Sequence, residues 1–193
     1  MVNEFKILQT LGKNMKDEMT MRQLAIDSGV PYTSALRFIK DNKSLFVINK
    51  KGNINLVSLN LSDSITKNYL VVAERKVAEL YLDKNKIFKI LLRHIPDGEY
   101  CLVLFGSRAE NTQREKSDVD LCIINRDGTK NIDLSEFETL SKLEVNPVFF
   151  KRQEFEAMLM EKEHNLADEI MRKHIILYGE EYFWNLVWGN VIR

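Results

Sequence analysis

The segment that most restricts the fold of this chain runs from Cys101 to Ile124, where a polar loop joins two apolar runs. The first run ends at Phe105 and is typical of a buried strand, and Gly106 follows where the backbone must turn tightly. The second run begins directly after Asp118-Val119-Asp120. At the two-residue period of a strand, both aspartates point to one face and the valine between them to the other.

Paired carboxylates on one strand face can hold a hard divalent cation such as Mg2+, which binds through one or two carboxylates and the phosphates of a substrate. Gly106 lets a phosphate approach the backbone, and Ser107 adds a hydroxyl at the start of an expected helix, whose amides favour an anion. The alternative is that the aspartates merely solvate a strand edge. We favour a binding site, because two carboxylates at the start of an apolar strand are costly unless something binds them.

Ten residues separate Gly106-Ser107 from Asp118-x-Asp120. This pattern resembles the signature of the DNA polymerase β-like nucleotidyltransferase superfamily, and most closely that of its minimal nucleotidyltransferases. The similarity covers roughly residues 100–150 and continues more weakly to Tyr178. It implies an α/β domain with a short mixed sheet flanked by helices. It also implies transfer of a nucleoside monophosphate, AMP above all, from a nucleoside triphosphate to an acceptor hydroxyl.

The resemblance assigns roles to the residues of the motif. Asp118 and Asp120 would bind Mg2+, and Gly106 and Ser107 would hold the nucleoside triphosphate, for which ATP is the first choice. Arg108 is a candidate for a phosphate contact, with a solvated arginine at the start of the helix as the alternative.

Active members of the superfamily carry a third carboxylate on a later strand, and this chain departs from the pattern there. The candidate strand spans Leu143 to Phe150, and the expected acid falls on Asn146. An amide can offer one oxygen to a metal, but it cannot act as a general base. Glu144, two residues earlier on the same expected strand face, is a possible replacement.

Composition and length define the class of protein. The chain has 193 residues, of which 45% are hydrophobic and 29% charged, as in soluble globular proteins with one or two cores. Met1 to Leu11 is amphipathic and has no signal-peptide core, and no apolar run is long enough to cross a membrane. Cys101 and Cys122 lie inside expected strands, where small core residues are favoured over a disulfide. Together these features indicate the cytoplasm.

The N-terminal segment has its own organisation. Residues 1–60 contain nine Lys and Arg against five Asp and Glu, a net charge of +4 in a chain whose total is zero. Helical spacing predicts one helix ending near Gly12, a second capped by Thr20 and ending at Ser28-Gly29, and a third over residues 33–42, after a turn at Val30-Pro31-Tyr32-Thr33. Two apolar runs around residues 49–53 predict a β-hairpin.

Three helices and a hairpin resemble a winged helix-turn-helix, in which residues 33–42 would be the recognition helix and 49–53 the wing tip. DNA contact then falls on polar and basic residues of these two elements: Tyr32, Thr33, Ser34, Arg37, Lys40, Lys50 and Lys51. The alternative is a module for protein docking or dimerisation. Because the positive charge is modest, DNA affinity is expected to be weak and to depend on a homodimer.

The rest of the chain completes a two-domain organisation. We expect a winged helix-turn-helix domain over residues 1–60, a helical connector over 61–84 and a nucleotidyltransferase-like domain over 85–193. The C-terminal aromatic segment, Tyr182 to Trp188, is expected to be core or subunit interface. The three histidines, His94, His164 and His174, have no metal-ligand spacing and are expected to be structural or solvated.

Three functions are compatible with these patterns. The first is an active Mg2+-dependent nucleotidyltransferase, for which the minimal family suggests tyrosines of a partner toxin of the HEPN type as one acceptor. The second is a transcriptional regulator whose nucleotidyltransferase-like domain senses a nucleotide without turning it over, which Asn146 in place of an acid favours. The third is a structural module that only assembles a larger complex.

Overall fold

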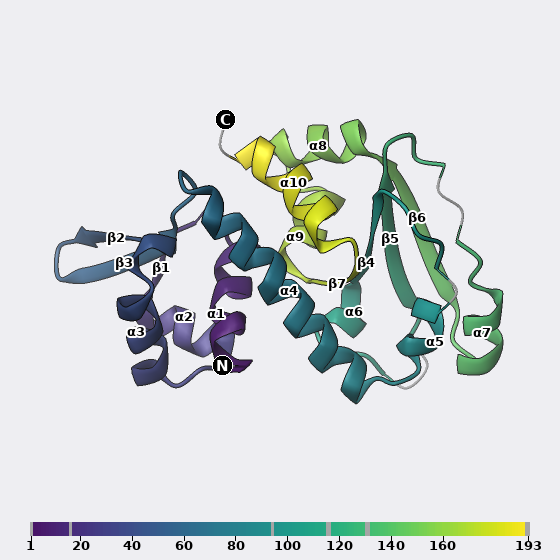
Figure 1. Ribbon diagram of the computed structural model, residues 1–193, viewed down its shortest axis with the longest axis horizontal. Coiled ribbons are helices and arrows are strands. Elements are labelled where there is room, and N and C mark those ends of the chain that lie inside the picture. The colour runs from purple at the N-terminus through teal and green to yellow at the C-terminus, as the bar shows by residue number, and fades with distance from the viewer. Residues whose placement is uncertain (1, 16, 94, 115–116, 130–131, 192–193) are drawn as a thin grey trace. The chain divides into compact units, whose positions relative to one another are not determined.

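A computed structural model describes residues 2–15, 17–93, 95–114, 117–129 and 132–191. The chain divides into two compact units, one formed by residues up to Val77 together with Val191 and the other by Ala78–Asn190. Each unit has its own sheet, and the two are described separately below (Figure 1).

The N-terminal unit consists of helices followed by a small antiparallel sheet. Its elements in chain order are α1 (Val2–Lys13), β1 (Met19–Thr20), α2 (Met21–Ser28), α3 (Tyr32–Asp41), the 3-10 helix η1 (Lys43–Leu45), β2 (Phe46–Lys51), β3 (Ile54–Leu59) and the first half of α4 (Ser64–Lys84). The strand order is β1-β3-β2. The core is apolar and draws on every helix, with Leu8, Leu24, Ala35 and Leu70 all 0% exposed.

Local signals define the boundaries of α2 as the sequence predicts. The Thr20 side chain accepts a hydrogen bond from the backbone N–H of Gln23, and Gly29 ends the helix in the left-handed conformation. The boundary of α3 differs from the prediction, because Pro31 occupies the cap and Tyr32 and Thr33 are already helical. The φ of −53° at Pro31 is the value that its ring imposes, so the proline leads the chain directly into the helix.

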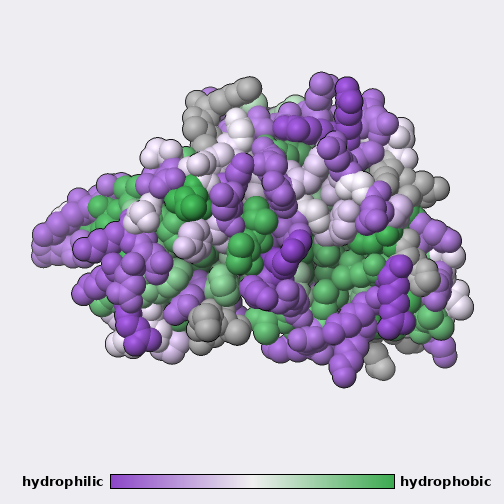
Figure 2. All heavy atoms as spheres, in the orientation of Figure 1, coloured by the Kyte–Doolittle hydropathy of each residue, from purple (hydrophilic) through white to green (hydrophobic). Residues whose placement is uncertain are grey.

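The hairpin also differs from the prediction in its extent. Strand β2 continues through Lys51, which pairs with Ile54, so the turn consists of Gly52 and Asn53 alone. The two basic residues therefore lie on a strand, at the end of the hairpin that hydrophilic residues cover in Figure 2. The two-residue strand β1 was not predicted from the sequence. It pairs Met19 with Val57 of β3. A segment of two residues has no sequence pattern that would predict such a long-range contact.

The C-terminal unit is built around a four-stranded mixed sheet of order β6-β5-β4-β7. Its strands are β4 (Tyr100–Phe105), β5 (Val119–Asn125), β6 (Val145–Lys151) and β7 (His174–Tyr178), and only the β5–β6 pair is parallel. The helices are the end of α4, α5 (Phe88–Arg93), α6 (Gly106–Ala109), α7 (Ser135–Ser141), α8 (Arg152–Met160), α9 (Leu166–Arg172) and α10 (Glu180–Val191). In Figure 1, α8, α9 and α10 lie on one side of this sheet, with α5 and α7 on the other.

The sheet core holds the residues that sequence analysis assigned to it. Cys101 and Cys122 are both fully buried free thiols, so the small-core interpretation is confirmed over a disulfide. Phe183 and Trp184 of α10 are fully buried, and α10 is longer than the predicted aromatic helix. His174 is fully buried, whereas His94 lies outside the described residues. No helix in the described part of the chain is long and apolar enough to span a membrane.

Candidate functional site

Strand register gathers the predicted site residues at one end of the C-terminal sheet. Asp120 of β5 lies opposite Phe105 of β4 on one side and opposite Asn146 of β6 on the other. Phe105 in turn lies opposite His174, the first residue of β7. Because directly paired residues share a face, these four side chains form one row on the same face of the sheet. Asp118 immediately precedes β5 and is exposed at the open end of this row.

Gly106 is in close contact with the second aspartate. Its φ is +67°, a conformation that side-chain-bearing residues rarely adopt. A Cβ at this position would also collide with Oδ2 of Asp120. The glycine therefore brings the start of α6 directly beside the carboxylate, with Ser107 half-buried as the next residue. This is the arrangement in which a phosphate can approach the backbone next to an acid that is predicted to bind metal.

Arg108 has a different set of contacts from the one predicted. It is only 8% exposed, so it is not the solvated arginine that was considered as an alternative. Its Nε donates to the main-chain oxygens of Ser117 and Asp118, both at 3.0 Å, and its Nη2 also donates to the Ser117 oxygen. The guanidinium thus connects α6 to the residues that lead into β5. Its observed contacts position Asp118, and a phosphate contact stays a prediction.

The second aspartate, Asp120, is partly buried and has other negatively charged side chains near it. Burial raises the pKa of the Asp120 carboxyl above its usual range. Hydrogen bonding with the Asn146 amide and attraction to Arg108 oppose the rise, while the negative charges of Asp118 and Glu169 add to it. A divalent cation bound here would remove the repulsion between the carboxylates. The two carboxylates fit the oxygen ligands that Mg2+ prefers, while the Asn146 amide turns its Nδ2 toward Asp118.

The strand that should carry the third acid is in place, but its side chain is an amide. Asn146 is exposed, and its Nδ2 lies 3.3 Å from Oδ2 of Asp118, to which it donates a hydrogen bond. Glu144 lies just before β6, and its main-chain oxygen accepts a hydrogen bond from the N–H of Val119 at 2.9 Å. Its side chain is exposed. The fold therefore places Asn146, and not Glu144, in register with Asp120.

One acidic residue near the site was not identified from the sequence. Glu169, on α9, is close enough to Asp120 to contribute to the rise of its pKa. It lies in the first turn of a short helix, where an acid is common because of the helix dipole. Nothing in the sequence distinguishes it from the other acids of that helix. Among the residues that the structure describes, no group of three or more His, Cys, Asp or Glu side chains is arranged to hold a metal ion.

Comparison with protein-family models gives one result. The model described as polymerase beta, nucleotidyltransferase, matches residues 85–182, just over half of the chain. The chain belongs to this nucleotidyltransferase family. The match includes the Gly106-Ser107 turn, both aspartates and Glu169, so the site described above lies within the family domain. Searches of curated proteins and of solved structures returned no match.

The N-terminal unit lies outside the matched nucleotidyltransferase segment and carries the residues predicted to contact DNA. Thr33, Arg37 and Lys40 are exposed on α3 at helical spacing, and Ala35 and Ile39 are buried on the opposite side. Tyr32, the first residue of α3, is 50% exposed and Ser34 is half-buried. Lys50 and Lys51 are exposed on β2. The fold brings the predicted residues of α3 onto the surface, and none of the predicted set is buried.

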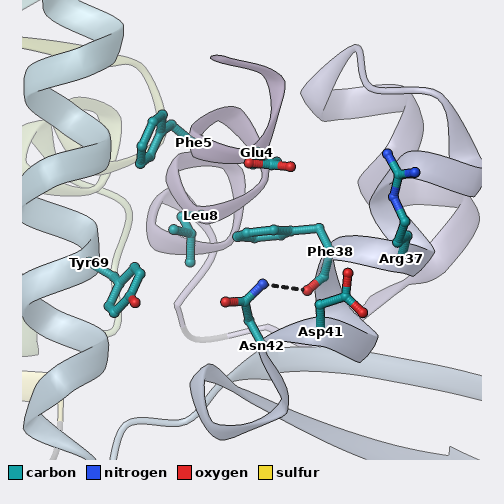
Figure 3. Close-up of a pocket in the computed structure, with 8 residues that line it drawn as sticks. All are labelled: Glu4, Phe5, Leu8, Arg37, Phe38, Asp41, Asn42 and Tyr69. Carbon is teal, nitrogen blue, oxygen red and sulfur yellow. Dashed lines mark hydrogen bonds between the residues drawn. The ribbon is translucent and has the colours of Figure 1, made fainter. Parts of the chain in front are cut away.

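A small pocket lies beside α3 in this unit (Figure 3). Its volume is about 240 Å3, and three aromatic side chains from three different helices, Phe5, Phe38 and Tyr69, line it together with Leu8. Arg37, one of the predicted DNA-contacting residues, lies at its edge. The volume is below the roughly 300–1,000 Å3 of most ligand sites. We assign no ligand to this pocket.

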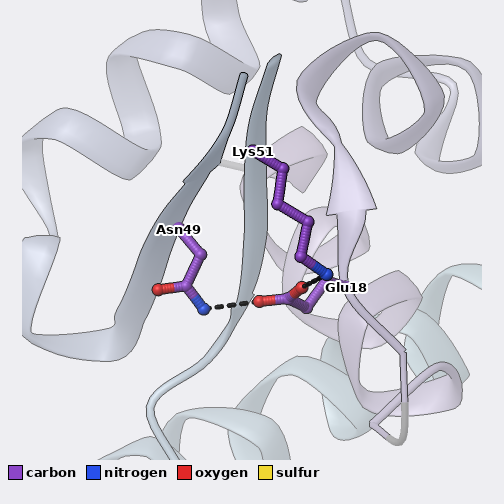
Figure 4. A network of polar contacts seen from close by, with 3 residues as sticks. All are labelled: Glu18, Asn49 and Lys51. Carbon is purple, nitrogen blue, oxygen red and sulfur yellow. Dashed lines mark hydrogen bonds and ion pairs between the residues drawn. The ribbon is translucent and has the colours of Figure 1, made fainter. Parts of the chain in front are cut away.

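One predicted wing residue already has an anionic partner (Figure 4). Lys51 Nζ lies 2.9 Å from Oε2 of Glu18, and Asn49 Nδ2 donates to Oε1 of the same carboxylate at 2.5 Å. These hydrogen bonds from Asn49 and Lys51 lower the pKa of the Glu18 carboxyl below its usual range. The Lys51 side chain remains 72% exposed. The carboxylate therefore engages Lys51, one of the two lysines predicted to meet DNA phosphates, together with Asn49.

Proposed function

We propose that the C-terminal unit transfers a nucleoside monophosphate from a nucleoside triphosphate, with ATP as the preferred donor, to the hydroxyl group of an acceptor. The observation that carries this proposal is the contact between Gly106 and Asp120, with Asp118 beside them, inside a domain of the nucleotidyltransferase family. The acceptor oxygen forms a bond to the α-phosphorus as the bond to the pyrophosphate oxygen breaks. Pyrophosphate leaves, and the hydroxyl proton passes to solvent.

Each residue of the site has a defined part in this reaction. Asp118 and Asp120 would hold Mg2+, which when bound supplies positive charge that orients the triphosphate and stabilises the transition state. Gly106 leaves room for the phosphates against the backbone, and the Ser107 hydroxyl donates to a phosphate oxygen. Arg108 holds the main chain before β5, so that the first aspartate keeps its orientation.

The test is isothermal titration of each nucleoside triphosphate, as a non-hydrolysable analogue with Mg2+, into the wild type and the Asp118→Ala/Asp120→Ala double variant. Micromolar binding that is lost in the double variant supports the nucleotide site. Transfer is then followed with ATP labelled at the α-phosphate. A double variant that retains the wild-type rate of transfer would refute the assignment, and absence of binding to any nucleotide would favour a purely structural role.

We further propose that the N-terminal unit is a winged helix-turn-helix that binds DNA, with α3 as recognition helix and the β2–β3 hairpin as wing. The support is the exposed polar and basic face of α3, with Lys50 and Lys51 on the hairpin. Electrophoretic mobility shift with fragments of the protein's own promoter tests this function. Lack of salt-sensitive binding at micromolar protein would leave docking or dimerisation as the role of this unit.

A second function of the family domain is favoured by Asn146. The amide lies in register with Asp120, at the position of the expected third acid, and donates to Asp118. In this alternative the domain binds a nucleotide without turning it over and regulates DNA binding by the N-terminal unit. Nucleotide-dependent DNA affinity without transfer supports it. Identical DNA-binding isotherms with and without nucleotide would exclude it.

The proposed partners follow from the same argument. We propose a homodimer, because the modest positive charge of the N-terminal segment calls for two DNA contacts, and light scattering measures the mass directly.

For the acceptor, we propose tyrosine hydroxyls of a partner toxin protein, as the resemblance to minimal nucleotidyltransferases implies. Co-expression with a protein encoded beside it, followed by mass spectrometry for added AMP, tests this acceptor class.

A further inference from the structure

The pairing of β4 with β7 brings a lysine to the Gly106 turn. Phe105, the last residue of β4, lies opposite His174, the first residue of β7, in an antiparallel pair. Because the two strands run in opposite directions, the residue that follows Phe105 and the residue that precedes His174 lie at the same end of the sheet. These residues are Gly106 and Lys173. Figure 1 accordingly shows α6, which begins at Gly106, beside β7.

An ion pair fixes the position of the Lys173 side chain. Its Nζ lies 2.8 Å from Oε1 of Glu110, the residue that directly follows α6. The main-chain N–H of Glu110 in turn donates to the oxygen of Gly106 at 3.3 Å, so the carboxylate belongs to the residue one helical turn after the glycine. The lysine is therefore held against α6, the helix that carries Ser107.

The ammonium group of Lys173 is in a different situation from the guanidinium of Arg108. Arg108 is buried, and its Nε and Nη2 donate to main-chain oxygens of the residues before β5. The Lys173 side chain is 48% exposed, and that of Glu110 is 33% exposed. An ion pair between side chains this exposed is weak, so Lys173 can exchange Glu110 for another anion at little cost.

We propose that Lys173 binds the β- and γ-phosphates of the nucleoside triphosphate, and that Glu110 holds the lysine beside the Gly106 turn in the absence of nucleotide. The proposal rests on the nucleotidyltransferase function proposed above and assigns a further phosphate ligand to the same site. The flexible four-carbon stem of the lysine permits the movement from carboxylate to phosphate.

The role of Lys173 in transfer follows from where charge develops. As the bond between the α-phosphorus and the bridging oxygen breaks, its electron pair passes to that oxygen, and the β- and γ-phosphates leave as pyrophosphate. The ammonium group offsets the growing negative charge through hydrogen bonds that it donates, and it transfers no proton. Arg108, whose donors are engaged within the fold, is not required for this contact.

The first test compares two ligands that differ in their number of phosphates. The ATP analogue with a methylene group between its α- and β-phosphates, and AMP, are each titrated with Mg2+ into the full chain by calorimetry. Lys173→Ala is expected to weaken binding of the analogue by about tenfold or more, because charge-assisted hydrogen bonds are strong. It should change the affinity for AMP by less than about twofold, because AMP lacks the β- and γ-phosphates. Lys173→Arg keeps the positive charge and should retain most of the affinity for the analogue.

The two partners of the ion pair are expected to give opposite results. Glu110→Gln removes the competing carboxylate and should strengthen binding of the analogue by about two- to fivefold. Lys89→Ala is the matched control, since Lys89 also forms an ion pair of 2.8 Å, with Asp83, and is 46% exposed. This control should leave the affinity for both ligands within about twofold of the wild-type value.

The proposal is wrong if Lys173→Ala binds the analogue as the wild type does, or if it loses affinity for AMP by the same factor. Weaker binding of the analogue by both Lys173→Ala and Glu110→Gln would show that the ion pair only supports the fold. In each of these cases the nucleotide site at the two aspartates can still act. If the wild type binds no nucleotide, the proposed function fails and this assignment with it. Thermal unfolding of each variant verifies that the fold is retained.

Discussion

The Arg108 guanidinium donates from Nε to the main-chain oxygen of Asp118, 3.0 Å away. This hydrogen bond joins the helix turn that begins at Gly106 to Asp118, the first of the two acids proposed to bind metal. The same nitrogen also donates to the oxygen of Ser117. The buried arginine therefore links the two halves of the Gly-Ser and Asp-x-Asp motif from inside the protein.

Arg108→Ala is expected to destabilise the protein by about 3 kcal/mol, because it removes charge-assisted hydrogen bonds to the oxygens of Ser117 and Asp118. Urea unfolding at neutral pH measures this change. Arg108→Lys keeps the charge but loses the planar fork, so it is expected to recover only part of the loss. If Arg108→Ala instead weakens nucleotide binding at unchanged stability, the arginine is a phosphate ligand and not a link within the fold.

Gly106→Ala is expected to cost about 1–3 kcal/mol and to reduce nucleotide affinity, because the residue has a positive φ and its Cβ would collide with Asp120. Gly189→Ala is the matched control. That glycine lies in α10, and an added Cβ meets no atom within 4 Å. It should therefore stabilise the helix by about 0.5–1 kcal/mol. Equal effects of the two substitutions in thermal unfolding would contradict the close contact at the site.

Asp120→Asn is expected to stabilise the metal-free protein at neutral pH. Burial raises the pKa of this carboxyl in the folded state above its ordinary value of 3.8, so the folded state binds the proton more tightly than the unfolded state. The contribution of Asp120 to stability is therefore favourable at low pH and is lost as the pH rises from its ordinary pKa through the raised one. The variant should lack this part of the pH dependence. A lower melting temperature for Asp120→Asn at pH 7, in the presence of a chelator, would argue against a raised pKa of the Asp120 carboxyl in the folded protein.

Glu18→Gln is expected to strengthen DNA binding if the hairpin is a wing, because Glu18 occupies Lys51 and Asn49 as a phosphate would. An increase of about two- to fivefold in affinity is expected, since an exposed ion pair is weak. Asp83→Asn is the control, since Asp83 forms an exposed pair of similar length with Lys89, 2.8 Å apart, in the C-terminal unit. If the wild type binds DNA and Glu18→Gln binds with the same affinity, the ion pair with Glu18 does not weaken the contact of Lys51 with DNA.

Neither cysteine is expected to react with a thiol reagent in the native protein. Cys101 and Cys122 are fully buried, and burial raises the pKa of both thiols well above the usual range, so the reactive thiolate is scarce. Colorimetric titration with a soluble disulfide reagent should give no modification without denaturant and two thiols in 6 M urea. Rapid modification of the native chain would mean that the β4–β5 core opens readily.

Local pattern was sufficient for the elements of the site. The apolar run ending at Phe105, the glycine after it and the Asp-x-Asp at the start of β5 follow from strand period and turn chemistry, which act between near neighbours. The same holds for the caps of α2 at Thr20 and Gly29. The short strand β1 and the start of α3 at Tyr32 were not predicted, because the first depends on a distant partner and the second on the fixed φ of a proline.

By itself the sequence determined that Asp118 and Asp120 share a face, next to a turn that can admit a phosphate, because those residues are close along the chain. Only the tertiary structure decided that Arg108 is buried against the carbonyl oxygen of Asp118, that Asn146 is the neighbour of Asp120, and that Glu169 acts on it from α9. These relations depend on strand register and helix packing across many intervening residues. No local preference encodes such distances, since they are set by how the whole sheet and its covering helices bury their apolar surface.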